Sequence, residues 1–570
     1  MDRIRIRAAA LTAAAALFAV ACGGPSGGGT SETLAADQTL RFALQNDVTH
    51  LDPGQVDAAV DITFLANVFD GLVKYDEHLK IVPDAAQSLP DVSSDGLTYT
   101  FKLRKDVKFS NGDPVTAKDW IYSFTRGLRI QAAYAGNLEA IKGAADVESG
   151  AAKTISGLTA PDDYTLKAQL DSPAGFWLSQ LAMPTEAMVV DQKVIEGTGD
   201  PDSEKWTQNP ATYVGTGPFK MTQRVPNSVM EFEPVANWWG GSTGALKKIH
   251  VDIGVDDASQ VKKFESGGYE IVGMANQAPA PDDVLRYKGD ATKSKLLTMF
   301  PGARTTGVGF NFVSGPFADK PGATPGDPTS TGGDGPGLPA RAAFSQAIDR
   351  AQLTDVACAK TITCFPATGG NITKGFKGYL GDNKDPYAKF DVNTAKANLQ
   401  KAGGATKFNG LTYRYNETGG NTKIAQNLQA QWKANLGVDI QLGASDFPTL
   451  EKDRKAKKVV LGRESWGIDY DNPQDWFDNL YTCAQAKVGR GNDQAYCNPS
   501  VDSQVKKADT LAIDKALPDY TSANEQLSKD IVWATLLYGQ SPYLAQPYLK
   551  GWGFNALYDY GWVDIKIIKH

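Results

Sequence analysis

The chain has 570 residues, more than the roughly 250 to 300 at which a single hydrophobic core stops growing, so two or three domains are expected. A hydrophobic content of 42% with 10% aromatic residues is that of a folded protein rather than a disordered one. The net charge of -7, without a long basic run, argues against nucleic acid as a partner.

Residues 1–21 have the layout of a signal peptide. Three arginines precede an apolar stretch of 14 residues, which is too short to span a bilayer as a helix. Residues 17–22 (LFAVAC) resemble a lipobox, in which small residues precede a cysteine that is acylated after cleavage. We therefore expect a diacylated Cys22 at the start of a flexible tether over residues 22–37, which would hold the protein at a membrane surface outside the cytoplasm. Cleavage without lipid is the alternative.

The segment after the tether mixes strands and helices irregularly, without the short period of a repeat protein. Alternating hydrophobicity predicts strands over residues 39–45 and 99–103. Helical spacing predicts helices over residues 62–73 and 116–126, the second with Thr116 as its N-cap.

A segment rich in glycine and proline divides the chain. Residues 319–340 have almost nothing to bury and predict an exposed loop. The elements predicted after it are helices over residues 341–353, 393–402 and 423–436, the last stopped by Gly437, and a strand over residues 438–442.

The cysteines other than Cys22 fall into two local pairs, Cys358 with Cys364 and Cys483 with Cys497. Outside the cytoplasm such pairs predict two disulfides. Four cysteines allow three connectivities, of which we favour the local one. The alternative is a metal site, but none of the four histidines lies close in sequence to either pair, so no metal is expected.

Motifs for catalysis are absent from the sequence. There is no nucleophile elbow, phosphate loop, zinc helix or calcium loop, and the four histidines are scattered. Carboxylate pairs such as Asp469 with Asp471 and Asp475 with Asp478 would suit a secreted hydrolase. With 65 acidic residues such neighbours arise by chance, and we predict that the protein is not an enzyme.

Asp469 stands out because of its surroundings. It follows the apolar residues 459–461 and then Trp466 and Gly467, and it precedes a turn over residues 471–473. A strand end of this kind offers exposed backbone, a flat apolar wall and one fixed negative charge, which suits a ligand with a cationic head. The alternative is a turn-forming aspartate beside a core tryptophan.

At these residues the chain resembles the dipeptide and oligopeptide-binding family of solute-binding proteins of ATP-driven importers. The likeness runs over nearly all of the chain after the tether, and residues 415–473 and 567–570 look most like the oligopeptide-binding branch. The motifs that carry it are residues 51–53 (LDP), 95–101 (DGLTYTF), 109–117 (FSNGDPVTA), 215–219 (GTGPF), 237–240 (NWWG) and 347–350 (AIDR).

The resemblance implies roles for particular residues. Asp469, four positions before Pro473, matches the aspartate that pairs with the terminal ammonium of a peptide. Asn421 stands where some oligopeptide binders use a histidine for the carboxylate of a longer ligand, which leaves the peptide length open. For Arg454 and Arg463, a solvated surface charge is the alternative to a contact with the ligand. The other matching positions are Asp47 and Val48 flanking the ligand, Tyr134, Phe447 where the family often has a tryptophan lining a side-chain pocket, Arg454 and Arg463 near the later residues and carboxylate of the ligand, and Trp466 and Gly467 in the strand that pairs with peptide backbone.

The fold implied is α/β and two-lobed, of the periplasmic-binding-protein (Venus flytrap, class II) type, in the large family 5 form with an extra subdomain in lobe I. Lobe I would comprise residues 38–304 and 544–570, with the subdomain inserted at about 61–184. Lobe II would comprise residues 305–543. The two would close over the ligand by a hinge motion.

The function implied is that of an extracytoplasmic lipoprotein that captures oligopeptides and delivers them to the permease subunits of an ABC transporter with cytoplasmic ATPases. We expect a monomer without a cofactor. The alternatives are a binding protein for another solute (a nickel chelate, haem or an oligosaccharide), a receptor that signals the presence of a peptide, or, from another class, the secreted carboxylate-pair hydrolase.

Overall fold

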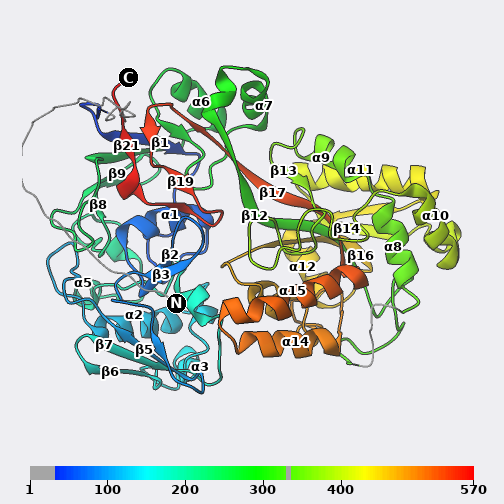
Figure 1. Ribbon diagram of the computed structural model, residues 1–570, viewed down its shortest axis with the longest axis horizontal. Coiled ribbons are helices and arrows are strands. Elements are labelled where there is room, and N and C mark those ends of the chain that lie inside the picture. The colour runs from blue at the N-terminus through cyan, green and yellow to red at the C-terminus, as the bar shows by residue number, and fades with distance from the viewer. Residues whose placement is uncertain (1–32, 329–334) are drawn as a thin grey trace, which may run out of the picture.

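The computed structural model describes residues 33–328 and 335–570. Two lobes are joined by two long strands, β12 (Leu297–Phe310) and β17 (Trp533–Ala545), which run side by side from one lobe to the other (Figure 1). These strands pair antiparallel from Leu297 opposite Leu544 to Gly309 opposite Trp533. Within the described residues no helix is long and apolar enough to cross a membrane.

Lobe I, the lobe that carries the chain's C-terminus, is built on a four-stranded sheet in the order β1-β10-β9-β8. The strands are β1 (Thr39–Leu44), β8 (Phe219–Val225), β9 (Val229–Pro234) and β10 (Lys248–Ile253). Leu40, Phe42 and Leu44 of β1 are buried, which confirms the strand predicted from alternation.

A second, smaller sheet in lobe I has the order β4-β5-β7-β6, from β4 (Asp91–Val92), β5 (Thr98–Lys102), β6 (Leu158–Asp162) and β7 (Thr165–Gln169). Helix α2 (Ala117–Arg129) confirms the predicted helix, and Thr116 forms a capping box with Asp119. The helix predicted over residues 62–73 is shorter. It is α1 (Ala59–Val68), because Phe69 adopts extended backbone and the chain continues into β2 (Val73–Tyr75).

The remaining elements of lobe I are short. They are β3 (Ile81–Pro83), α3 (Ala144–Glu148), α4 (Trp177–Leu181), α5 (Gln192–Gly197), α6 (Asp257–Glu265), β11 (Ile271–Val272), α7 (Pro281–Gly289), and, near the C-terminus, β18 (Leu549–Lys550), β19 (Gly553–Phe554), β20 (Asp559–Tyr560) and β21 (Lys566–Ile567).

Lobe II is built on the larger sheet, in the order β11-β17-β12-β16-β14-β15 with β13 beside β17. Its further strands are β13 (Cys364–Pro366), β14 (Thr412–Asn416), β15 (Gln441–Ser445) and β16 (Leu461–Gly467). Its helices are α8 (Leu338–Gln346), α9 (Arg350–Ala357), α10 (Val392–Lys401), α11 (Gly419–Leu436), α12 (Phe447–Lys455), α13 (Gln474–Leu480), α14 (Pro499–Asp509) and α15 (Ile513–Asp530).

Two predictions for this lobe need correction. The helix predicted over residues 341–353 is interrupted, because the Asp349 side chain accepts hydrogen bonds from the backbone of Ala351 and Gln352 and starts a new helix, α9. The strand predicted over residues 438–442 begins only at Gln441. The helix over residues 423–436 is confirmed, with Gly437 in the left-handed conformation at its end.

The glycine- and proline-rich segment is anchored more firmly at its start than expected. Asp319 is almost fully buried and forms an ion pair with Arg341 at 3.0 Å. Residues 320–328 run through turns and loop, and residues 329–334 of the predicted loop lie outside the described residues. The prediction of an exposed loop therefore holds for residues 320–328 but not for Asp319, and the last three residues of the predicted segment begin helix α8 (Leu338–Gln346).

Both cysteine pairs come together in the local connectivity. The Cα atoms of Cys358 and Cys364 are 5.4 Å apart, and those of Cys483 and Cys497 are 4.4 Å apart. These separations are ones that a disulfide bridges.

Candidate ligand-binding site

One edge of β16 is free over the residues that the sequence singled out. Along its whole length β16 pairs antiparallel with β12, with Trp466 opposite Thr305 and Gly467 opposite Arg304. On its other edge β14 pairs only with Leu461 and Gly462. No strand among the described residues covers residues 463–467 on that side. Their outward main-chain groups can therefore receive an added strand.

Asp469 lies just beyond this open edge and is held by a second carboxylate. Its backbone N–H donates to Oδ2 of Asp475 at 3.1 Å, and Nε1 of Trp466 donates to the same oxygen at 3.0 Å. Asp475 is fully buried in the first turn of α13. A single buried side chain thus fixes both Asp469 and the indole beside it.

The two carboxyl groups share an apolar environment that disfavours charge. Burial raises the pKa of Asp469 to about 6, against the lowering effects of its hydrogen bond with Asp475 and of the Arg304 guanidinium. Burial, and then repulsion from Asp469, raise the pKa of Asp475 well above its usual value. A cationic group arriving here would relieve this repulsion and favour the ionised pair.

Tyr134 of lobe I interacts electrostatically with the same carboxylates. Burial raises the pKa of its hydroxyl, and the next largest causes are the carboxylates of Asp469 and Glu186. Glu186 is almost fully buried, and both of its oxygens lack a hydrogen-bond partner among the described residues. The structure therefore brings Tyr134 and Asp469, which belong to different lobes, into one electrostatic neighbourhood.

Positive charge and amides gather at the other end of β16. Arg463 donates from Nη1 to Oδ1 of Asn416 at 3.3 Å, and Asn421 donates to the same oxygen at 3.1 Å. Burial lowers the pKa of Arg463 to about 10, so the guanidinium stays charged at neutral pH. Its Nε has no hydrogen-bond partner within the described chain, which leaves donor capacity for an anion.

Arg454 occupies a different environment from the one the resemblance implied. Its side chain is buried in α12, donates to Oε1 of Glu451 at 2.7 Å, and lies 3.5 Å from Glu464 and 3.9 Å from Asp493. In this structure Arg454 is committed to carboxylates of the protein itself. Its contact with a ligand stays a prediction that requires rearrangement of this cluster.

The remaining predicted residues are split between the lobes. In lobe I, Oδ2 of Asp47 accepts hydrogen bonds from Arg224 at 2.9 Å and from the backbone of Asn227 at 2.7 Å, while Val48 is buried. In lobe II, Phe447 begins α12 and is 53% exposed, an unusual degree for a phenylalanine. Their roles toward a ligand stay predictions.

Three residues of the site were not predicted as such. Asn416 and Asp475 hydrogen-bond to predicted residues, and Arg304 pairs opposite Gly467, but each is placed there by tertiary folding. In the sequence, Asp475 is only one of several neighbouring carboxylates. The sequence feature that could identify Asp475 is its position in the first turn of the helix that directly follows the turn after Asp469.

Comparison with known proteins identifies the family. Residues 80–487 match the family described as bacterial extracellular solute-binding proteins, family 5, middle region. The chain belongs to this family. Among curated relatives, the oligopeptide-binding protein OppA of Bacillus subtilis is 27% identical, over 83% of this chain and 82% of its own. The murein peptide-binding protein MppA of Escherichia coli is also 27% identical, over 94% of each chain.

Solved structures confirm the two-lobed fold. The unliganded open form of MppA superposes with a TM-score of 0.79 at 25% identity, covering 95% of this chain and 99% of the other. Haemophilus influenzae OppA in complex with the peptide RPPGFSPFR gives a TM-score of 0.66 at 22% identity, covering 94% and 100%. This family 5 solute-binding protein therefore has the predicted two-lobed fold.

Proposed function

We propose that this protein captures short peptides between its lobes and delivers them to the permease of an ABC transporter with cytoplasmic ATPases. The observation that carries the proposal is the free edge of β16, which has Arg463 near its start and Asp469 just past its end. The open edge can pair with the main chain of an extended peptide, and the opposite charges at the two ends of the strand can pair with the peptide's ammonium and carboxylate.

The direction of the bound peptide follows from these charges. The ammonium would lie near Asp469 and the carboxylate toward Arg463, so the peptide would run antiparallel to β16. Six positions separate the two residues, about 20 Å at the usual rise of a strand. This span suits an oligopeptide better than a dipeptide. Main-chain pairing holds the ligand whatever its sequence, while water in the pockets accommodates different side chains.

The lipid anchor and the location are part of the proposal. Cys22 and residues 1–21 lie outside the described residues, so the anchor rests on the sequence pattern alone. Both pairs of cysteines at bonding distance suit an oxidising location outside the cytoplasm. The proposed assembly is a monomer tethered to the membrane, which meets the permease when loaded.

The geometry counts against a carboxylate-pair hydrolase that uses Asp475. Asp475 is fully buried, and its oxygens accept hydrogen bonds from Trp466, Asn479 and the backbone of Asp469. A catalytic pair needs both carboxylates to face the scissile bond across a cleft. Asp475 instead supports Asp469 from behind.

The experiment that tests the proposal is native mass spectrometry of protein that begins at residue 23 and is purified without denaturation. A set of released masses that fragment as short peptides is the expected result, and it gives the peptide length directly. A single non-peptide mass, such as a nickel chelate, haem or an oligosaccharide, would contradict the proposal. Sustained turnover of glycoside or peptide substrates would contradict it in favour of the hydrolase.

A further inference from the structure

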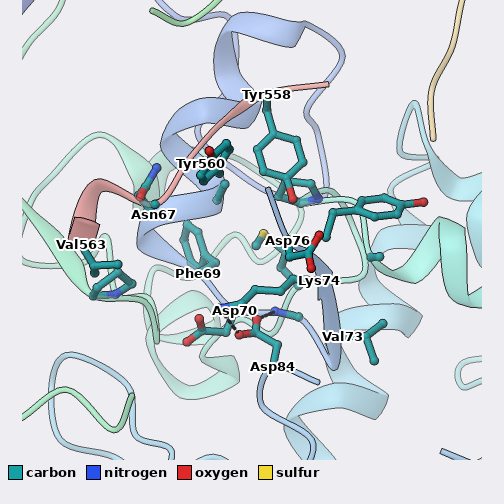
Figure 2. A pocket seen from close by; sticks show the side chains of 18 of the residues that line it. Asn67, Phe69, Asp70, Val73, Lys74, Asp76, Asp84, Tyr558, Tyr560 and Val563 are labelled. Carbon is teal, nitrogen blue, oxygen red and sulfur yellow. Dashed lines mark hydrogen bonds and ion pairs between the residues drawn. The ribbon is translucent and has the colours of Figure 1, made fainter. Parts of the chain in front are cut away.

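Lobe I contains a cavity that the peptide site does not use. Its volume is about 490 Å³, within the range of small-molecule sites. It lies between the segment from the end of α1 through β2, the chain around Met183, and the C-terminal segment from Tyr558 to Asp564 (Figure 2). None of the residues predicted to contact the peptide lines it.

One wall of the cavity is an ionic cluster around a single lysine. The Lys74 ammonium lies 2.8 Å from Oδ1 of Asp84, and Figure 2 shows Asp70 and Asp84 converging on it. Asp70 is 4% exposed and accepts a hydrogen bond from Nε1 of Trp239 at 2.9 Å. Oδ1 of Asp84 is buried and has no hydrogen bond within the described residues besides this ionic contact. Two buried carboxylates thus face one ammonium.

Further carboxylates stand toward the solvent side of the cavity. Glu77 and Asp564 are exposed, and Asp76 is half-buried. Burial, and then repulsion from Glu77, raise the pKa of Asp564. With the two inner aspartates, five carboxylates line the cavity against the one ammonium of Lys74. Burial, and then repulsion from Asp84, raise the pKa of Asp70 to about 7, and the carboxylates that stay ionised favour a cation in the cavity.

The rest of the lining is aromatic and apolar. Phe69 and Tyr558 are buried, while Tyr560 and Trp238 are partly exposed, and Met183 adds a polarizable side chain. Figure 2 shows Tyr558 and Tyr560 on the side of the cavity opposite Asp70 and Asp84. Aromatic faces attract cations, and they also take up the apolar body that an organic cation carries.

We propose that this cavity binds a small organic cation, namely an ammonium on a flat apolar body, independently of the peptide between the lobes. The ammonium would lie among the carboxylates, and the body would lie against the tyrosines. An anion is disfavoured because Lys74 is already neutralised by Asp84 and Asp70, the two carboxylates that help to raise its pKa. A metal ion is disfavoured because the described residues hold no group of three or more side chains arranged as metal ligands.

The test is calorimetry with 2-phenylethylammonium on protein saturated with peptide, so that the interlobe site is occupied. We expect saturable binding of one equivalent in the millimolar range or tighter. The anion 3-phenylpropionate has the same aromatic body and should give no saturable heat. Absence of binding by the amine, or equal binding of the anion, would overturn the proposal. Displacement of the amine by further peptide would overturn it too, because the amine would then occupy the peptide site.

Variants locate the bound amine. The double variant Glu77→Gln with Asp564→Asn changes two exposed side chains and should weaken amine binding about fivefold or more, since it removes both exposed carboxylates on the solvent side of the cavity. The matched control, Glu233→Gln with Asp282→Asn, removes two exposed charges of lobe I outside the cavity and should leave the affinity unchanged. Peptide affinity should be the same in both variants. Equal amine binding by the two variants would place the amine elsewhere and overturn the proposal.

Discussion

Replacing Asp469 by asparagine tests the most specific statement about the site, that this carboxylate neutralises the ammonium of the peptide. The substitution keeps the shape of the side chain and the backbone hydrogen bond to Asp475, and it removes only the charge. A hydrogen bond to a charged group contributes roughly 1.5 to 3 kcal/mol, so affinity should fall about 10- to 150-fold. The partly buried setting of Asp469 favours the upper half of this range.

The assay is calorimetry with tri-alanine and N-acetyl-tri-alanine on the wild type and on Asp469→Asn. Acetylation removes the ammonium, so it should weaken binding to the wild type strongly and to the variant little. Asp439→Asn is the matched control, because it removes an exposed charge of the same lobe that is paired with Lys433. Unchanged affinity of Asp469→Asn, or an equal effect of acetylation on both proteins, would refute the assignment.

Further predictions follow from the charges, the cysteines and the buried ion pairs. Burial raises the pKa of Asp469 to about 6, while a bound ammonium favours the ionised form of this carboxyl group. Peptide affinity should therefore be present above that pH and lost below it, and calorimetry should find it about tenfold weaker at pH 5 than at pH 7. An affinity that does not change with pH would contradict this. Arg126→Met leaves the fully buried Asp52 without its bidentate partner. Urea denaturation should show that the free energy of unfolding falls by about 3 to 5 kcal/mol. A loss below about 1 kcal/mol, the scale of a surface ion pair, would show that this pair is not isolated from water. Opening the Cys483–Cys497 bridge with a double serine variant should cost about 3 kcal/mol, given its separation of 14 residues, and equal stability of oxidised and reduced wild type would argue against the bridge. Cys22→Ser should move the protein from the membrane fraction to the soluble fraction, and retention in the membrane fraction would refute the lipid anchor.

The parts of the fold that follow local rules were predictable from sequence. The strand at residues 39–45, the capped helix after Thr116 and the helix that ends at Gly437 depend on alternation, a capping box and a left-handed glycine, all of which are local. The errors fell where tertiary contacts override periodicity. The helix predicted through Asp349 is broken because its carboxylate caps a new helix while Arg350 is buried against carbonyl oxygens.

The candidate site divides in the same way. Asp469, Trp466 and Gly467 lie within four positions of one another, so a motif could identify them together. The residue that holds two of them, Asp475, could not be assigned a role, because its orientation depends on how α13 folds back against the end of β16. Arg304 is likewise brought to the site only by the pairing of β12 with β16.

The free edge of β16 matters most for function, and the sequence predicted exposed backbone there without showing which neighbouring strands leave that edge open. It exists because β14 leaves β16 after pairing with Leu461 and Gly462, while β12 continues beside β16 to Gly467. Pairing with β12 fixes the register of β16, and the missing partner on the other side leaves room for an added strand. An exposed edge of this kind invites aggregation unless it is shielded, and here lobe I comes close to the end of β16, because Tyr134 interacts electrostatically with Asp469. The same arrangement would therefore position lobe I to close over a peptide once the peptide has paired with β16.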